Sequence, residues 1–179
     1  MTSLVVGIGD CRISNDPSEV LVTHALGSCI AVVIHDPIAR VAGLLHYMLP
    51  DSKLDREKAE DRPFVFADTG IPLLFQWAYQ HGAVKSRLVV MAVGGAQMLD
   101  DNGVFNIGKL NQTAMRKIFW KAGVLVQREE VGGTLSRTVS IEIDTGRVLL
   151  RSPGRADQYL GNTAPRREAF DGLQHSYRG

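Results

Sequence analysis

Short apolar runs, separated by glycine, proline and polar residues, are the main pattern of this chain. Runs rich in Val, Ile and Leu that are too short for an amphipathic helix predict β-strands. The strands predicted in this way are Leu4–Ile8, Glu19–Thr23, Cys29–Ile34, Val41–Leu49, Arg87–Val93, Val124–Glu130, Thr138–Asp144 and Val148–Arg151. Thr145-Gly146 predicts a hairpin turn between the last two of them.

A different spacing marks the first long helix. Apolar side chains recur on one helical face at Ile71, Leu74, Phe75 and Ala78. Asp68 or Thr69 is predicted to cap the start of this helix. Pro72 suits its first turn, and Gly82 suits the position just after its end. The polar residues 51–62 before it predict a solvated loop or a short surface helix.

A second helix is predicted to begin at Asn111 or Thr113 and to end at Gly123. Its apolar stripe consists of Ala114, Ile118, and Phe119 or Ala122. Many strands and only two or three helices indicate an α/β protein of the α+β type, without strict alternation of strands and helices.

The length of 179 residues fits one domain, which we expect to span residues 1–160. Residues 161–179 contain a proline, several glycines and few apolar side chains. A segment of this composition cannot bury enough apolar surface to order itself, so we expect a flexible C-terminal tail.

The composition excludes several classes of partner. Lys and Arg number 20 and Asp and Glu 19, a net charge of +1, so no electrostatic attraction to nucleic acid or to an anionic membrane is expected. No apolar run approaches the ~20 residues that span a bilayer. The N-terminus lacks the basic and apolar regions of a secretory signal, and 2 cysteines cannot form the disulfide framework of a secreted protein. These features predict a cytoplasmic protein.

No cofactor or metal site is predicted. Gly7-Ile8-Gly9 begins like a dinucleotide-binding fingerprint, but Arg12 stands in the place of the third glycine. The histidines at positions 24, 35 and 46 do not have the spacing of metal ligands. Cys11 has no CxxC partner and is interpreted as a spare thiol.

The third and fourth apolar runs, Cys29–Ile34 and Val41–Leu49, contain a candidate reactive pair. Asp36-Pro37-Ile38-Ala39 predicts a turn, because Asp suits its first position and Pro presets φ at the second. A symmetric hairpin centred between Pro37 and Ile38 pairs Cys29 directly with His46 on one face. Cβ atoms of such a pair lie about 4.5–5.5 Å apart, which lets a thiol reach an imidazole. A slip of one residue would place the two side chains on opposite faces.

A thiol beside an imidazole is a usable nucleophile. A neighbouring imidazolium lowers the pKa of the Cys29 thiol, and His46 can then act as general acid and general base. Thr23, at the end of the preceding strand, can supply a hydroxyl that orients the ring. Gly27 permits close approach of a substrate, and the turn at Gly27-Ser28 offers backbone N–H groups for an oxyanion.

Structural interpretations stay open beside the catalytic one. A lone cysteine in an apolar run is more often a small buried side chain. His46, between Leu44 and Met48 at strand spacing, equally fits a core histidine with satisfied hydrogen bonds. Gly94-Gly95-Ala96 and Gly132-Gly133 are most simply turns, although either can line a cleft.

At these residues the chain resembles the chemoreceptor glutamine deamidase family of bacterial and archaeal chemotaxis, CheD. The similar segments are Leu26–Val32, Asp36-Pro37, Ala39-Arg40, His46–Pro50, Gly94–Ala96, Ile107–Asn111 and Gly132-Gly133. They extend over residues 4–151, nearly all of the predicted fold. The chain departs from the family at Ser136-Arg137, where the family has Gly-Arg.

The resemblance implies that Cys29, His46 and Thr23 are catalytic. It also implies layered mixed β-sheets with outer helices, like those of glutamine-deamidating bacterial toxins. The implied reaction converts receptor Gln to Glu and ammonia through a thioester, and glutamyl methyl esters are a related class of substrate. The substrate is then a side chain on a long receptor helix, so an open cleft is expected. Some family members also bind a CheC-type phosphatase of the response regulator.

Two other functions fit the same residues. A non-catalytic module would bind a receptor or a phosphatase and keep the Cys–His pair as a remnant. A cysteine hydrolase would act on an unrelated amide or ester, retaining thiol reactivity while leaving receptors unchanged.

Overall fold

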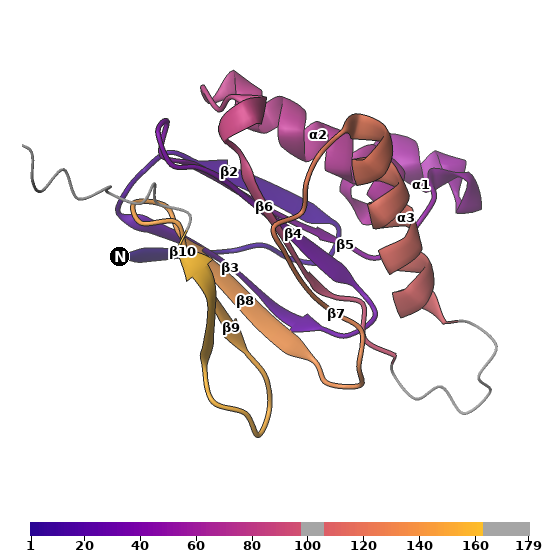
Figure 1. Ribbon diagram of the computed structural model, residues 1–179. Helices are drawn as coiled ribbons and strands as arrows, with labels where there is room; N and C mark the ends of the chain where they lie inside the picture. Colours follow the sequence, from indigo (N-terminus) through magenta and orange to yellow (C-terminus); the bar gives the residue numbers. More distant parts are fainter. Residues whose placement is uncertain (98–105, 163–179) are drawn as a thin grey trace, which may run out of the picture.

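The computed structural model describes residues 1–97 and 106–162, which form two mixed five-stranded sheets and the helices beside them (Figure 1). The strands are β1 (Thr2–Val5), β2 (Asp10–Ser14), β3 (Glu19–Leu26), β4 (Ile30–Asp36), β5 (Val41–Tyr47), β6 (Val89–Gly94), β7 (Arg128–Val131), β8 (Arg137–Glu142), β9 (Arg147–Arg151) and β10 (Gln158–Asn162). The helices are α1 (Arg56–Asp61), α2 (Ala67–Gln80) and α3 (Ile107–Ala122), with short 3₁₀ turns at Ser52–Leu54, Pro63–Val65 and Lys85–Arg87.

The two sheets differ in their position in the fold. The outer sheet has the strand order β1-β3-β8-β9-β10, and the central sheet has the order β2-β5-β4-β6-β7. Each contains one parallel pair, β1 with β3 and β6 with β7, and the other pairs are antiparallel. The predicted α+β class is confirmed.

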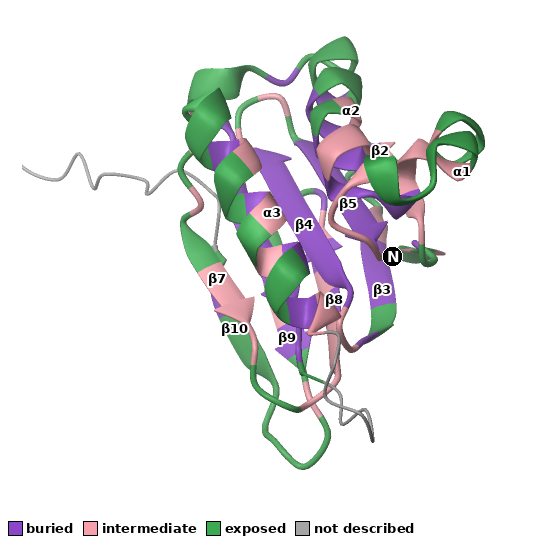
Figure 2. Cartoon of the chain, turned by 90° about the vertical axis from the view of Figure 1, so that its right-hand side faces the viewer, coloured by how far each residue is buried: buried purple, intermediate pink, exposed green. Residues whose placement is uncertain are grey.

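The central sheet lies between the helices and the outer sheet, so the fold has three layers (Figures 1 and 2). Side chains alternate along a strand, and β4 therefore serves two cores. Ile30 and Ile34 pack with the helices, whereas Ala31 and Val33 pack with the outer sheet. Every residue of β4 and β5 is buried, which explains why these strands are nearly continuous apolar runs in the sequence.

The predicted strands are found, with shifted ends, and two more occur at sheet edges. The first strand covers Thr2–Val5, not Leu4–Ile8. The strands β2 and β10 have no β-branched run, because an edge strand needs only one paired side and tolerates polar residues. Of the predicted tail, Gly161 and Asn162 belong to β10, and residues 163–179 lie outside the described residues.

The helix ends were predicted better than the helix starts. Gly82 follows α2 and Gly123 caps α3 in a left-handed conformation, as predicted. The start of α2 at Ala67 contradicts the predicted caps, because the Asp68 carboxylate instead accepts hydrogen bonds from the amide and hydroxyl of Ser52. Pro72 consequently lies inside α2. The predicted polar surface segment forms α1.

The start of α3 lies upstream of both predicted positions. Asn106 caps the helix, and its side chain accepts a hydrogen bond from the amide of Lys109 at 3.0 Å. Asn111 is instead fully buried within α3. Within residues 1–97 and 106–162, no helix combines the length and apolar character needed to cross a bilayer.

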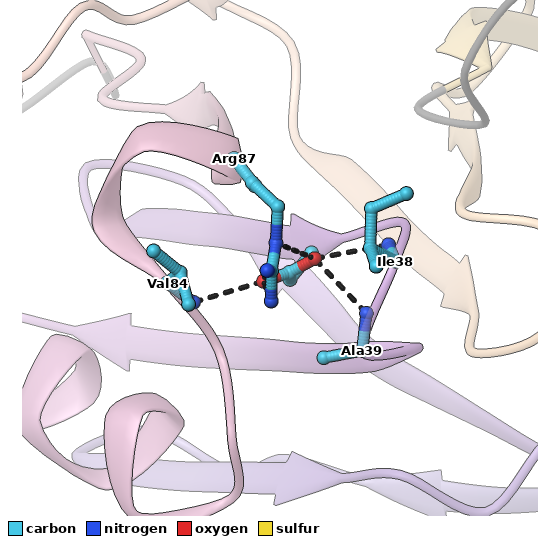
Figure 3. A network of polar contacts seen from close by, with 5 residues as sticks. Ile38, Ala39, Val84 and Arg87 are labelled. Carbon is cyan, nitrogen blue, oxygen red and sulfur yellow. Dashed lines mark hydrogen bonds and ion pairs between the residues drawn. The ribbon is translucent and has the colours of Figure 1, made fainter.

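A buried carboxylate fixes the turn between β4 and β5. Asp36 accepts hydrogen bonds from the amides of Ile38, Ala39 and Val84 at 2.8–3.1 Å, and it forms an ion pair with Arg87 at 2.7 Å (Figure 3). Burial alone would raise the pKa of this carboxyl. The hydrogen bonds from Arg87 and from the three amides outweigh burial and lower the pKa of Asp36 to about 2.

Replacing Asp36 by Asn is expected to lower the free energy of unfolding by about 2–3 kcal/mol at neutral pH, because charge-assisted hydrogen bonds at a buried site are lost. The carboxylate contributes fully above its ordinary pKa of 3.8, and the contribution is lost as pH falls toward about 2. Urea denaturation at several pH values should therefore show the two proteins converging as the solution becomes acidic.

Asp144→Asn is the matched control from the neighbouring turn. Asp144 pairs with Arg40 at 3.2 Å, but the two side chains are 49% and 61% exposed. Removing an exposed ion pair costs about 0.5 kcal/mol or less. If Asp36→Asn is no more destabilising than this control, the carboxylate does not anchor the hairpin.

Candidate active site

The β4–β5 hairpin brings Cys29 and His46 to the same layer, but not directly opposite each other. His46 pairs with Ala31, so the predicted pairing of His46 with Cys29 is wrong by two residues. The loop spans residues 37–40, and its last residue, Arg40, has φ of 51°, which moves the centre of the turn by one residue. A displacement of two residues preserves the face, so Cys29 and His46 are diagonal neighbours facing the outer sheet.

Thr23 of β3 contacts His46 across the space between the sheets, as predicted. Its Oγ1 lies 2.7 Å from His46 Nδ1 and 2.7 Å from the carbonyl oxygen of Val6. Thr23 is fully buried, and His46 is 1% exposed. The contact is shielded from water, where a hydrogen bond is electrostatically stronger than at the surface.

This contact determines the tautomer of His46. A hydroxyl has one proton to donate, and a carbonyl oxygen can only accept. Thr23 therefore donates to Val6 and accepts a hydrogen bond from His46 Nδ1–H. Neutral His46 then carries its proton on Nδ1 and keeps a lone pair on Nε2.

Within the part of the chain that the structure describes, the second ring nitrogen of His46, Nε2, lacks a hydrogen bond although it is buried. Buried polar atoms are nearly always paired, so an unpaired one needs an explanation. Cys29 lies on the same face of the hairpin, but its sulfur makes no hydrogen bond to Nε2 in this structure. A free lone pair on that face can accept the thiol proton once the two groups come together during catalysis.

Burial controls the protonation of both reactive groups. It lowers the pKa of His46 from 6.5 to about 4. Burial also raises the pKa of the Cys29 thiol, an effect reduced by the residue's own backbone N–H, which favours the thiolate. The free protein at neutral pH thus holds a neutral thiol and a neutral imidazole. Burial therefore opposes the lowering of the Cys29 pKa by an imidazolium that the sequence predicts.

Each of the three carbonyl oxygens of the loop Gly27–Cys29 accepts a hydrogen bond from another segment of the chain. The donors to them are, in chain order, Ala96 N–H at 2.8 Å, Asn111 Nδ2 at 2.9 Å and Gly95 N–H at 2.7 Å. The neighbouring Gly94 has φ of 115°, and a Cβ atom there would collide with the Cys29 carbonyl oxygen. Only glycine fits this close approach.

The amide N–H groups of Ser28 and Cys29 lie next to the sulfur in sequence. Among the described residues, none accepts a hydrogen bond from the N–H of Ser28. The N–H of Cys29 faces its own sulfur. N–H groups beside a nucleophile can stabilise a developing oxyanion when they turn to it.

Two parts of this frame were not identified as site residues from the sequence. Gly94-Gly95 predicts a turn, and Asn111 predicts a helix start, but both hold the Cys29 loop. The position of Asn111 was detectable in principle, because Met115 and Gly108 lie on its helical face and are also buried. An amide on a buried face is expected to bond specific partners.

The site is more enclosed than the predicted open cleft, since Cys29 is only 9% exposed. A cavity of about 360 Å³ lies between α3 and the glycine turns, and neither Cys29 nor His46 contributes to its lining. Gly95, Gly132 and Gly133 line this cavity, and Gly132 N–H donates to the Gly94 carbonyl at 2.9 Å. The interpretation that these glycines line a cleft therefore holds alongside their role as turns.

The remaining sequence candidates take other positions. Cys11 is buried in β2, and burial together with Asp10 raises its pKa to about 12. The Nε2 atom of His35 lies 3.0 Å from the carbonyl oxygen of Ile143. His24 is exposed. Among the described residues, no group of three or more His, Cys, Asp or Glu is placed to hold a metal ion.

Most of the chain is similar to proteins of one family. The family described as CheD chemotactic sensory transduction matches residues 48–152. A "probable chemoreceptor glutamine deamidase CheD" of Solibacter usitatus is 51% identical over 160 residues, which cover 89% of this chain and 95% of that protein. A relative from Syntrophus aciditrophicus with the same description is 53% identical over 154 residues, with coverage of 86% and 96%. The "chemoreceptor glutamine deamidase CheD" of Thermotoga maritima is 38% identical over 154 residues, with coverage of 86% and 94%.

His46 is expected to keep its proton on Nδ1 at neutral pH and to titrate near pH 4. Nitrogen-15 NMR of the histidine rings reports the tautomer, and His46→Gln identifies the signals. Thr23→Val keeps the side-chain shape but removes the hydroxyl, so it should abolish the tautomer preference, whereas Thr23→Ser should retain it. A proton on Nε2 in the wild-type protein would contradict the deduced hydrogen-bond direction.

Iodoacetamide is expected to alkylate Cys29 slowly at neutral pH and faster at alkaline pH, because a raised pKa keeps the thiol protonated. Cys11 is an internal control, since its higher burial and a pKa of about 12 should make it the slower thiol at each pH. Timed labelling followed by peptide mass spectrometry separates the two. Rapid labelling of Cys29 at pH 6 would show that the resting thiol is not neutral.

Proposed function

Because the chain belongs to the CheD family of chemotactic sensory transduction proteins, we propose that it hydrolyses glutamine side chains of chemoreceptors to glutamate and ammonia. Cys29 is the proposed nucleophile and His46 the proposed general acid and base. Thr23 orients the ring, and the N–H groups of Ser28 and Cys29 bind the oxyanion.

One observation carries this proposal. The bond from His46 Nδ1–H to Thr23 leaves His46 Nε2 unprotonated, buried and unpaired in the layer that contains Cys29. A histidine that served only the core would be expected to satisfy both ring nitrogens. An unpaired Nε2 in the basic tautomer fits a group that exchanges a proton with a thiol and a substrate.

The first half of the reaction forms a thioester. The Cys29 proton passes to His46 Nε2 as the sulfur bonds to the carbonyl carbon of the glutamine side chain, and the carbonyl oxygen becomes an oxyanion. His46 then gives this proton to the amide nitrogen as the C–N bond breaks and ammonia leaves. Transfer of the proton during attack suits two groups whose burial favours their neutral forms.

The second half of the reaction restores the thiol. Water loses a proton to His46 Nε2 and attacks the thioester carbonyl, the new C–O bond forms, and the C–S bond breaks. The proton returns to the Cys29 sulfur, leaving glutamate. A glutamyl methyl ester would follow the same route with methanol as the leaving group, so we include methylesterase activity in the proposal.

The site consists of side chains and backbone groups of this chain, and the proposed mechanism uses no cofactor. The proposed location is the cytoplasm, where chemoreceptors present their signalling helices. A CheC-type phosphatase is a proposed second partner, which would compete with the receptor for the same face.

Incubation of a receptor cytoplasmic fragment with the wild-type protein is expected to convert selected Gln residues to Glu, detected by peptide mass spectrometry. In H₂¹⁸O each new carboxylate should carry one labelled oxygen, because the thioester is cleaved by water. Cys29→Ala and His46→Ala should lower the rate at least about 1,000-fold, since each removes a group on which both half-reactions depend.

Cys11→Ala is the matched control, because it removes the other thiol of the chain and should leave the rate unchanged. Thermal melts establish that each variant is folded. Deamidation that persists in Cys29→Ala would end the proposed mechanism. Absence of deamidation with the folded, reduced wild type would favour the adaptor function, or another substrate if Cys29 still reacts with activated esters.

A further inference from the structure

Asn111 occupies a position that is unfavourable for its side chain. It lies in the interior of α3 and is fully buried. Asparagine is a poor helix former, and a buried amide is costly unless it is hydrogen-bonded. The bonds that Asn111 makes are therefore expected to explain its presence.

Those bonds join the two chain segments that carry the reactive pair. Asn111 Nδ2 donates to the carbonyl oxygens of Ser28 and Met48, each at 2.9 Å. Ser28 directly precedes Cys29, and Met48 follows His46 by two residues just after β5 ends. One side-chain amide thus connects the Cys29 loop to the end of the strand that carries His46.

The bond to Ser28 also fixes the direction of a neighbouring N–H. The Ser28 carbonyl and the Cys29 N–H belong to one peptide unit, which is planar and trans, so they point in opposite directions. Asn111 holds the carbonyl toward α3 and thereby turns the Cys29 N–H away from α3. The Ser28 N–H is oriented in the same way through the bond from Ala96 N–H to the Gly27 carbonyl, but that contact is between backbone groups.

The helix itself is fixed at the same residue. The hydroxyl of Tyr47 donates to the backbone carbonyl of Asn111 at 2.9 Å. Tyr47 is fully buried and pairs with Ile30, the residue after Cys29. The distance between α3 and the Cys29 loop is consequently set by two independent hydrogen bonds.

We propose that Asn111 is a positioning residue whose side-chain amide orients the Cys29 N–H as an oxyanion donor. Its effect on deamidation rests on the proposed function. Its effect on the N–H does not, because a small activated ester also passes through an oxyanion when it acylates a thiol.

The test compares two reactions of the same thiol. In acylation by p-nitrophenyl acetate, the Cys29 proton passes to His46 Nε2, a C–S bond forms through an oxyanion, and nitrophenolate leaves. In alkylation by iodoacetamide, the same proton is lost, a C–S bond forms and iodide leaves, but no oxyanion develops. The ratio of the acylation rate to the alkylation rate therefore reports the oxyanion donors. Partial unfolding would change the access of both reagents to the thiol and would not selectively lower this ratio.

Asn111→Ala is expected to lower the rate of Cys29 acylation about 100-fold, the usual effect of losing an oxyanion donor, with alkylation within about threefold of wild type. Met115→Ala is the matched control, because Met115 is fully buried one turn further along α3 without a hydrogen bond to the loop. It should keep the wild-type ratio even where its thermal stability falls further.

Asn111→Asp provides a second variant of nearly the same size. Burial against two carbonyl oxygens should keep this carboxyl protonated, so one hydrogen bond remains and an intermediate ratio is expected. Intact-protein mass spectrometry measures both adducts, with Cys11→Ala as the background so that one thiol is present.

The outcomes separate the two proposals. An unchanged ratio in both Asn111 variants, or a wild-type Cys29 that is alkylated but never acylated, would overturn the positioning role. A reduced ratio in a protein that leaves receptor fragments unchanged would support the positioning role while the proposed substrate fails. A reduced ratio together with a similar loss of receptor deamidation would support both.

Discussion

The central sheet is covered on both faces, and this constraint decides where each of its polar groups must find a partner. Every residue of β4 and β5 is buried, and a buried polar group is costly without a hydrogen bond. Asp36 meets a guanidinium at one end of the hairpin, and Tyr47 meets the Asn111 carbonyl at the other. His46 meets Thr23 through one ring nitrogen only. Among the buried side-chain nitrogen and oxygen atoms of the described residues, only His46 Nε2 and Asn111 Oδ1 lack a partner, and the first is the one in the central sheet. Such exceptions are typical of reactive centres.

The pattern of apolar residues predicts most of the architecture because burial on both faces leaves a strong signal in β4 and β5. The edge strands β2 and β10 leave little signal, since one side of each needs no partner. The shared face of Cys29 and His46 was predictable from strand alternation. Their exact register was not, because it depends on a left-handed Arg40, a conformation that this residue type does not indicate. Asn111 was misplaced for a related reason: its preference for helix starts was overridden by contacts with residues distant in sequence.

Burial shifts the pKa values of the two reactive groups in opposite directions, and both shifts favour an uncharged side chain. It raises the pKa of Cys29 and lowers the pKa of His46. Because oxidants and electrophiles react with the thiolate, a protonated and nearly buried cysteine is protected while no substrate is bound. The burial that limits access of a substrate to the Cys29 sulfur therefore also limits oxidation of that sulfur.

The order in which the parts of the site occur along the chain has a consequence for biosynthesis. A ribosome makes Cys29 and His46 early, but it makes the side chain of Asn111 and the strand β8 only in the second half of translation. The growing chain therefore contains the thiol, the imidazole and Thr23 before the helix residue that holds the Cys29 loop exists. An incomplete chain that ends before Asn111 would therefore carry the reactive side chains without the hydrogen bond that holds the Ser28 carbonyl.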